Sequence, residues 1–197
     1  MIDNPTLKTI RERRSTLVFT SELVSDEDVE AILEAGRWAP SAANSQPWDF
    51  VVARDARLRS AIASSLARVT WGWGGFAKVP VMVVVAVDPQ RDPEHFVEDG
   101  AVAAQNICLA AHSLGLATAW AGVYSSNAAD GGGIEDELKE LLSLPRTHRI
   151  IAVIPIGVAE IDPEGSRHPL ARMVHHDRYS PSSELESDDR EERQEVH

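Results

Sequence analysis

The feature that most constrains the fold is an apolar run from Val79 to Val87, in which every residue is Val, Met, Ala or Pro. A run without alternation of polar and apolar residues is typical of a strand that is buried on both faces. Pro80 has no N–H to donate to a neighbouring strand, so we expect it at the entry of the strand. The run therefore predicts the central strand of a covered sheet.

Apolar spacing places the other elements around this strand. Helices are expected at residues 5–13, from Ser25 to the Pro40 loop, from Asp55 to Val69, at 94–114 and at 134–143, and strands at 50–54, 117–123 and 149–158. No Gly-x-Gly-x-x-Gly follows the first strand, so a Rossmann nucleotide site is not supported. We therefore predict an α+β fold with one mixed, mostly antiparallel sheet that is flanked by helices.

The longest expected helix, residues 94–114, is rich in alanine. Its predicted buried stripe consists of Ala101, Ala104, Ile107, Cys108, Ala111 and Leu114. Small side chains permit the close approach of another helix, and we expect that helix to come from a second subunit. Gly115 is expected to end the helix.

Composition excludes several classes of protein. The formal net charge of −12 argues against a general nucleic-acid binder. No apolar run is long enough to span a membrane, and Met1–Asn4 does not start a secretory signal peptide. The single cysteine, Cys108, cannot form an internal disulfide, which fits a reducing cytoplasm. His175-His176-Asp177 lacks a further ligand cluster at matching spacing, so we expect no metal site.

The C-terminus differs in composition from the rest of the chain. Residues 180–197 carry seven acids and two arginines, together with Pro and Ser. Such a segment cannot bury enough apolar surface to offset the entropy of ordering. We therefore predict one folded domain at residues 1–180 and a disordered acidic tail at 181–197.

The segment Ala39–Trp48 suits neither a helix nor a strand, because Pro40 and Pro47 each lack a backbone donor. It lies between an expected helix and an expected strand, and its short polar side chains can bind backbone or a ligand. Such a junction often carries binding groups. On composition alone, an ordinary loop whose polar residues cap their own backbone remains an equal alternative.

Three stretches, in order, resemble the FMN-dependent nitroreductase family. Residues 37–52 read RxAPSxxNxQPWxFVV, Arg13-Arg14-Ser15 lies before them, and Arg167-His168-Pro169-Leu170 with Asp177-Arg178-Tyr179 follows near the end. The resemblance covers roughly residues 5–180. It implies the predicted fold, an intertwined homodimer, and two FMN sites at the subunit interface.

The resemblance assigns phosphate and ribityl contacts to Arg13, Ser15 and Arg167, and places Arg14 beside a position next to the flavin. A phosphate needs cations or clustered N–H donors, which suits this set. The alternative for the arginines is a solvated basic helix end.

Two further segments are assigned to the flavin ring. Pro40, Ser41, Ala42 and Asn44 match the segment that reaches the ring of the flavin bound mainly by the other subunit. Trp120, Ala121 and Gly122 match a strand end whose backbone N–H faces N5, the atom that takes hydride; an ordinary strand-end glycine is the alternative. Gln46 and Trp48 are expected to hold the loop and pack beneath it.

The resemblance implies an oxidoreductase in which NAD(P)H passes hydride to the flavin and a flat acceptor, such as a quinone or nitroaromatic, receives it. No side-chain acid or base is needed for the hydride step. Two alternatives are a protein that stores or occludes FMN and a specialised flavin- or deazaflavin-processing enzyme. One departure from the family pattern is Leu17, where a cation usually lies near the pyrimidine edge of the ring.

Overall fold

In the computed structural model of the chain, residues 2–68, 76, 78–124, 133–161 and 163–180 are described. The helices are α1 (Pro5–Glu12), α2 (Asp26–Arg37), α3 (Ala56–Leu66), α4 (Phe96–Ser113) and α5 (Ile134–Leu142), with 3-10 turns η1 (Ala42–Asn44) and η3 (Leu170–Arg172). The strands are β1 (Trp48–Ala53), β2 (Val81–Val87), β3 (Ala117–Thr118), β4 (Ala121–Gly122) and β5 (Arg149–Gly157).

The strands form one sheet in the order β1-β2-β5-β3, and β4 also pairs with β5. All ladders between these strands are antiparallel, and one parallel bridge, Ser15 to Thr118, makes the sheet mixed. Every residue of β2 is buried, which confirms the prediction of a central strand. Pro80 precedes the first residue of β2, as its missing N–H requires.

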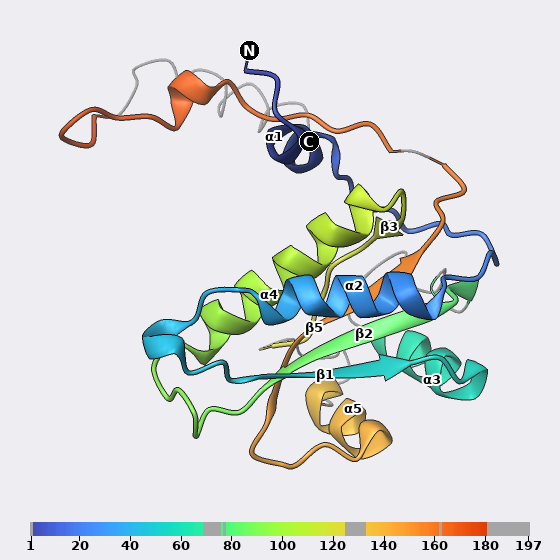
Figure 1. Cartoon of the computed structure of the whole chain (residues 1–197). Coiled ribbons are helices and arrows are strands. Elements are labelled where there is room, and N and C mark those ends of the chain that lie inside the picture. The colour runs from blue at the N-terminus through green and yellow to red at the C-terminus, as the bar shows by residue number, and fades with distance from the viewer. Residues whose placement is uncertain (1, 69–75, 77, 125–132, 162, 181–197) are drawn as a thin grey trace, which may run out of the picture. The chain divides into compact units, whose positions relative to one another are not determined.

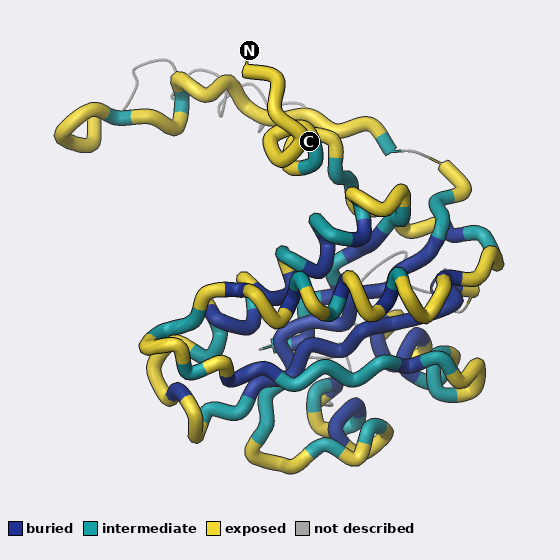
Figure 2. The backbone as a smooth tube through the Cα atoms, viewed as in Figure 1, coloured by how far each residue is buried: buried dark blue, intermediate teal, exposed yellow. Residues whose placement is uncertain are grey.

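The sheet is the middle of three layers (Figure 1). Alternate residues of β2 point to opposite faces, so Val83 and Val85 pack with α2 and α4, whereas Met82 and Val84 pack with α3 and α5. Figure 2 shows the buried strands enclosed by helices whose outer surfaces are exposed. The predicted α+β architecture is confirmed.

Local capping explains where the helices begin. The Ser25 side chain accepts the backbone N–H of Asp28 at 3.0 Å and so caps the start of α2, where the helix is expected to begin. Asp55 accepts the N–H groups of Arg57 and Leu58 at the start of α3, and Asn4 caps α1 in the same way.

Two details differ from the sequence predictions. The strand expected at 117–123 is divided into β3 and β4 by Ala119 and Trp120. Leu114, expected in the buried stripe of α4, is 45% exposed because the helix ends at Ser113 and Gly115 turns the chain with a φ of +78°. Ala103, which the stripe omitted, is buried instead.

The chain divides into two compact units, residues 1–163 and 164–197. The second unit contains the 3-10 turn η3. It also contains a tilted pair of aromatic rings, those of His175 and Tyr179, whose centroids lie 4.6 Å apart. The tail at 181–197 lies outside the described residues, so the boundary at residue 180 stays a prediction. Within the described part of the chain, no helix is long and apolar enough to cross a membrane.

Gly100 fixes how closely α4 approaches the sheet. A Cβ at this position would lie 2.5 Å from Ile151 Cγ1 and 2.8 Å from Val87 Cγ1, both in the buried core. We expect Gly100→Ala to lower the free energy of unfolding by about 1–3 kcal/mol through overpacking, despite the better helix propensity of alanine. Urea unfolding measures the change. Gly133→Ala is the control and should change stability far less, because among the described residues its Cβ would meet only Asp136 Oδ2, at 3.6 Å. Equal stability of the two variants would contradict the tight packing.

Candidate functional site

The segment that follows α1 is attached to the sheet edge by backbone hydrogen bonds. The N–H of Thr16 donates to the carbonyl of Thr118 at 3.0 Å, and the N–H of Thr20 donates to Val158 at 2.9 Å. The Phe19 side chain is 1% exposed and packs edge-to-face on Phe76. These contacts hold residues 13–15, at the start of the segment, close to β3.

Arg13 and Ser15 lie side by side, with Arg13 Nη1 3.5 Å from Ser15 Oγ. Arg13 Nε is buried and has no hydrogen-bond partner among the described residues. A buried guanidinium N–H without an acceptor is costly, so this nitrogen suits a ligand that brings an oxygen acceptor or an anion. The residues therefore fit a phosphate group, as the sequence predicts.

Cys108, on α4, shares this region. Burial raises the pKa of its thiol, and a hydrogen bond with Thr118 and the charge of Arg13 oppose that rise only partly. A neutral buried thiol is a poor nucleophile. Cys108 therefore contributes packing here, as a small core residue.

Arg14 is engaged with the end of α1. Its Nη1 donates to the carbonyls of Arg11 at 2.5 Å and Arg13 at 2.9 Å, where a helix leaves carbonyls unsatisfied. Its predicted position beside a flavin stays a prediction. Arg167 belongs to the second unit, where its Nη1 donates to the carbonyl of Ser166 at 2.6 Å, and its predicted phosphate contact also stays a prediction.

The segment Trp120–Gly122 lies at the edge of the sheet, where its strand β4 pairs with β5. Ala121 pairs with Val153 and Gly122 with Ala152 in β5. Of the described residues, Trp120 alone would come within 4 Å of a Cβ on Gly122, with Nε1 at 3.8 Å. Because glycine has no side chain, a ligand can approach the backbone at this residue more closely than it could at any other residue type.

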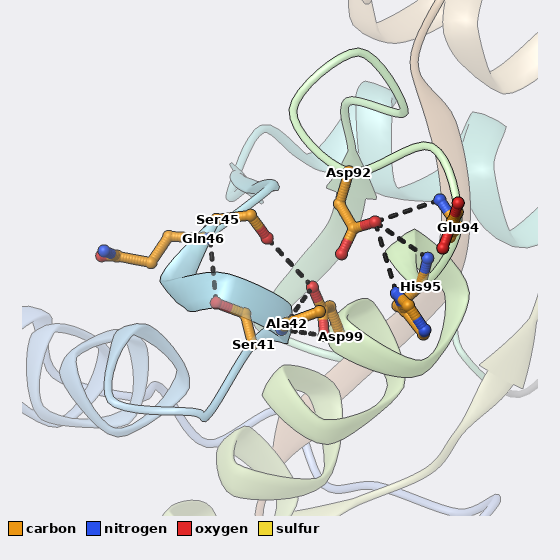
Figure 3. A network of polar contacts seen from close by, with 8 residues as sticks. All are labelled: Ser41, Ala42, Ser45, Gln46, Asp92, Glu94, His95 and Asp99. Carbon is orange, nitrogen blue, oxygen red and sulfur yellow. Dashed lines mark hydrogen bonds and ion pairs between the residues drawn. The ribbon is translucent and has the colours of Figure 1, made fainter.

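The loop around η1 is held by its own polar groups and by α4 (Figure 3). Ser41 Oγ accepts the N–H of Gln46 at 2.9 Å, and Gln46 Nε2 donates to the carbonyl of Asn44 at 3.3 Å. Trp48 is 7% exposed and belongs to the core. The predicted structural roles of Gln46 and Trp48 are confirmed, while Pro40 and Asn44 are exposed.

The two groups of predicted residues lie apart in one copy of the chain. The η1 loop contacts Asp99 in the first turn of α4, whereas Arg13 lies near Cys108, about 14 Å further along the helix axis at 1.5 Å per residue. Figure 1 shows the η1 loop and α1 toward opposite ends of α4. One copy therefore presents two separate half-sites.

Asp99 is a site residue that the sequence analysis missed. Its carboxylate is 5% exposed and contacts the η1 loop. The sequence does contain a pattern that points to Asp99. Asp99 lies four and eight positions before Ala103 and Ile107, so an acidic residue occupies the apolar face of the helix. Among the described residues, no group of three or more His, Cys, Asp or Glu side chains could hold a metal ion.

The nitroreductase family model matches residues 10–158 of the chain. A provisionally named NADH dehydrogenase/NAD(P)H nitroreductase of Archaeoglobus fulgidus is 35% identical over 154 residues, which are 77% of this chain and 83% of the relative. FMN reductase [NAD(P)H] of Bacillus subtilis is 26% identical over 93% of this chain and 78% of its own length.

A solved structure has the same architecture. It is that of a provisionally named nitroreductase from Desulfovibrio desulfuricans in complex with FMN, with a TM-score of 0.72 and 32% identity over 91% of this chain and 100% of that one. The family match covers the last turn of α1, the segment after it, the η1 loop and residues 120–122, and it includes all the predicted site residues except Arg167. The chain belongs to the nitroreductase family.

Proposed function

We propose that the chain is an FMN-dependent oxidoreductase that takes reducing equivalents from NAD(P)H and delivers them to a small flat acceptor such as a quinone or nitroaromatic. The observation that carries the proposal is the buried Nε of Arg13, which lies beside Ser15 and has no partner among the described residues, in a chain of the nitroreductase family. When bound, FMN supplies the redox chemistry, because its ring accepts and passes on hydride.

The residues of this chain would bind and orient that cofactor. Arg13 and Ser15 would hold the phosphate, one through charge-assisted hydrogen bonds and the other through its hydroxyl, and Arg167 is expected to complete the cradle. Gly122 would let the ring approach the backbone of β4, because glycine itself has no side chain. No acid or base on the chain is required.

A second copy of the chain would complete each site. The two groups of residues lie toward opposite ends of α4, and the family resemblance assigns the η1 loop to the flavin that is bound mainly by the other subunit. A groove of about 410 Å³ between α1, α2 and α4, lined in part by Ile10, Ala35 and Leu109, offers apolar surface for the partner. Ile10 is 50% exposed in the single chain. We therefore infer a homodimer, and we place it in a reducing cytoplasm because the single cysteine is buried.

An absorbance spectrum followed by an anaerobic NADPH titration tests the proposal. We expect a yellow protein with about one FMN per subunit, whose colour NADPH bleaches and a quinone restores. A yellow protein that NADPH cannot bleach would instead support storage or occlusion of FMN. A colourless protein that does not take up added FMN would contradict the proposal altogether.

Leu17 offers a test of how charge near the pyrimidine edge of the flavin ring affects the redox potential of bound FMN. Leu17 is 39% exposed, two residues after Ser15, where the family usually has a cation. A unit charge about 4 Å from the ring is worth roughly 4 kcal/mol at an effective dielectric of 20, and solvent screening reduces this to about 1–2 kcal/mol. We expect Leu17→Arg to raise the midpoint potential of bound FMN by roughly 20–45 mV, since about 30 mV corresponds to 1.4 kcal/mol for two electrons.

A reductive titration against a reference dye measures that potential. Val18→Arg is the matched control, because Val18 is 45% exposed and this substitution adds the same charge one residue away. An unchanged or lower potential in Leu17→Arg, or an equal rise in both variants, would show that Leu17 does not face the ring edge.

A further inference from the structure

The η1 loop has a backbone that its sequence does not favour. Ala43, Asn44 and Gln46 have φ values of 49°, 57° and 48°, in the left-handed region, and none of them is glycine. Asparagine tolerates this region, but alanine and glutamine have a Cβ that clashes with the backbone there. Such a conformation persists only when surrounding contacts hold it.

A carboxylate on α4 supplies contacts to the η1 turn from outside the loop, while Gln46 is held by Ser41 and by Arg91. Asp99 accepts the N–H of Ala42 with both oxygens, at 3.1 and 3.3 Å, and the hydroxyl of Ser45 at 3.2 Å. Ala42 and Ser45 lie on either side of the two left-handed residues of η1. Figure 3 shows the Asp99 side chain reaching from α4 to both. The carboxylate therefore joins the two ends of the turn.

A charged acceptor suits this position. Asp99 is buried, and hydrogen bonds to an ionised acceptor are stronger than those between neutral groups. It also lies in the first turn of α4, where the helix dipole favours a negative charge. Loss of the side chain would leave the N–H of Ala42 without this acceptor.

We propose that Asp99 is a positioning residue, which fixes the left-handed conformation of the η1 loop and thereby presents Pro40, Ser41 and Asn44 to the flavin ring. The role toward the ring rests on the proposed function, whereas the hold on the loop does not. Asp99 does not itself touch the cofactor in this proposal. It acts through the backbone of Ala42 and the hydroxyl of Ser45.

Asp92 provides a matched control. It is also a buried aspartate near the start of α4, 7% exposed, and Figure 3 shows it close to Asp99. Its carboxylate accepts the N–H groups of His95 and Glu94, each at 3.0 Å, and these bonds hold the pKa of Asp92 below its ordinary value although burial opposes them. Asp92 therefore supports the helix start, and within the described part of the chain it forms no hydrogen bond with the η1 loop.

Hydrogen exchange at the Ala42 amide of the full-length protein tests the hold on the loop. We expect Asp99→Leu, which keeps the branched shape but has no acceptor, to speed exchange by about 10- to 100-fold, the factor expected from losing a hydrogen bond to a charged group. Asp99→Asn, which keeps one acceptor, should give a smaller rise and serves if Asp99→Leu does not fold. Asp92→Asn changes a neighbour of Asp99 but none of the bonds to Ala42 and Ser45, so it should raise exchange at Ala42 far less than Asp99→Leu does. Unchanged exchange in both Asp99 variants would overturn the proposal.

The same variants then test the role toward the flavin. We expect the visible spectrum of bound FMN to shift and its affinity to fall roughly fivefold in the Asp99 variants, because a loosened loop must be ordered on binding. Faster exchange at Ala42 with a wild-type spectrum and affinity would overturn this role and leave the proposed function intact. Wild-type protein that binds no FMN would overturn the proposed function and the role together, while exchange still reports on the hold.

Discussion

Arg13→Ala is expected to weaken FMN binding by about 2 kcal/mol, roughly 30-fold in Kd, because it removes charge-assisted hydrogen bonds to the phosphate. The same change should not destabilise the flavin-free protein in proportion. Arg13 Nε is buried without a partner among the described residues, so its removal also relieves a cost. A large loss of affinity with little loss of stability distinguishes a binding residue from a structural one.

Fluorescence titration of FMN measures the affinity, and urea unfolding without added FMN measures the stability. Lys8→Ala is the control, since it removes one positive charge from the exposed surface of the neighbouring helix α1. An equal loss of affinity in both variants would indicate long-range attraction instead of direct contact. An unchanged Kd in Arg13→Ala would rule out the phosphate assignment.

The sequence predicts the fold well where local chemistry decides the structure. The β2 run from Val81 to Val87 has no polar residue, so only a strand covered on both faces satisfies it. Ser25 and Asp28 together determine the start of α2. These signals lie within a few residues of the element they specify, which is why they can be read without the structure.

The break between β3 and β4 has a cause that lies on another strand. Both short strands follow one register along β5, which puts Ala119 opposite Pro155. Proline has no N–H to donate, so the ladder is interrupted where it faces that residue. The apolar spacing of residues 117–123 does not predict this break, because the proline that causes it lies on the partner strand, more than thirty residues later.

The candidate site also combines features that local sequence predicts with features that depend on long-range contacts. The polar residues and prolines of residues 39–48 identify a binding loop, but the left-handed backbone of Ala43 and Gln46 is not evident from the sequence because neither residue favours it. The contact from Asp99, 57 residues away from Ala42, supplies what local sequence lacks. Long-range contacts of this kind decide the geometry of the site, whereas local patterns decide only its place in the chain.

Phe19→Ala is expected to lower the free energy of unfolding by about 3–5 kcal/mol, the usual cost of emptying a buried aromatic site. Phe19 is 1% exposed, and its ring lies 6.0 Å from that of Phe76 in an edge-to-face arrangement. Its backbone also forms a bridge with Ala159. Phe19 thus attaches the segment that carries Arg13 and Ser15 to the part of the core that lies between the sheet and helices α3 and α5.

Urea unfolding of the flavin-free protein at one fixed protein concentration measures this cost, since dimerisation would make stability depend on concentration. Val18→Ala is the control, because Val18 is 45% exposed and should change stability by less than about 0.5 kcal/mol. Phe19→Leu keeps most of the apolar volume and should fall between the two.

The Phe19 and Arg13 variants together separate anchoring from binding. Phe19→Leu should weaken FMN binding as well as stability, because a loosened segment no longer holds Arg13 and Ser15 close to β3, whereas Arg13→Ala should affect FMN binding alone. If Phe19→Ala costs less than about 1 kcal/mol, the segment is not packed into the core as described. If Phe19→Leu lowers stability and leaves FMN affinity intact, the position of Arg13 does not depend on this anchor, and α1 must hold it instead.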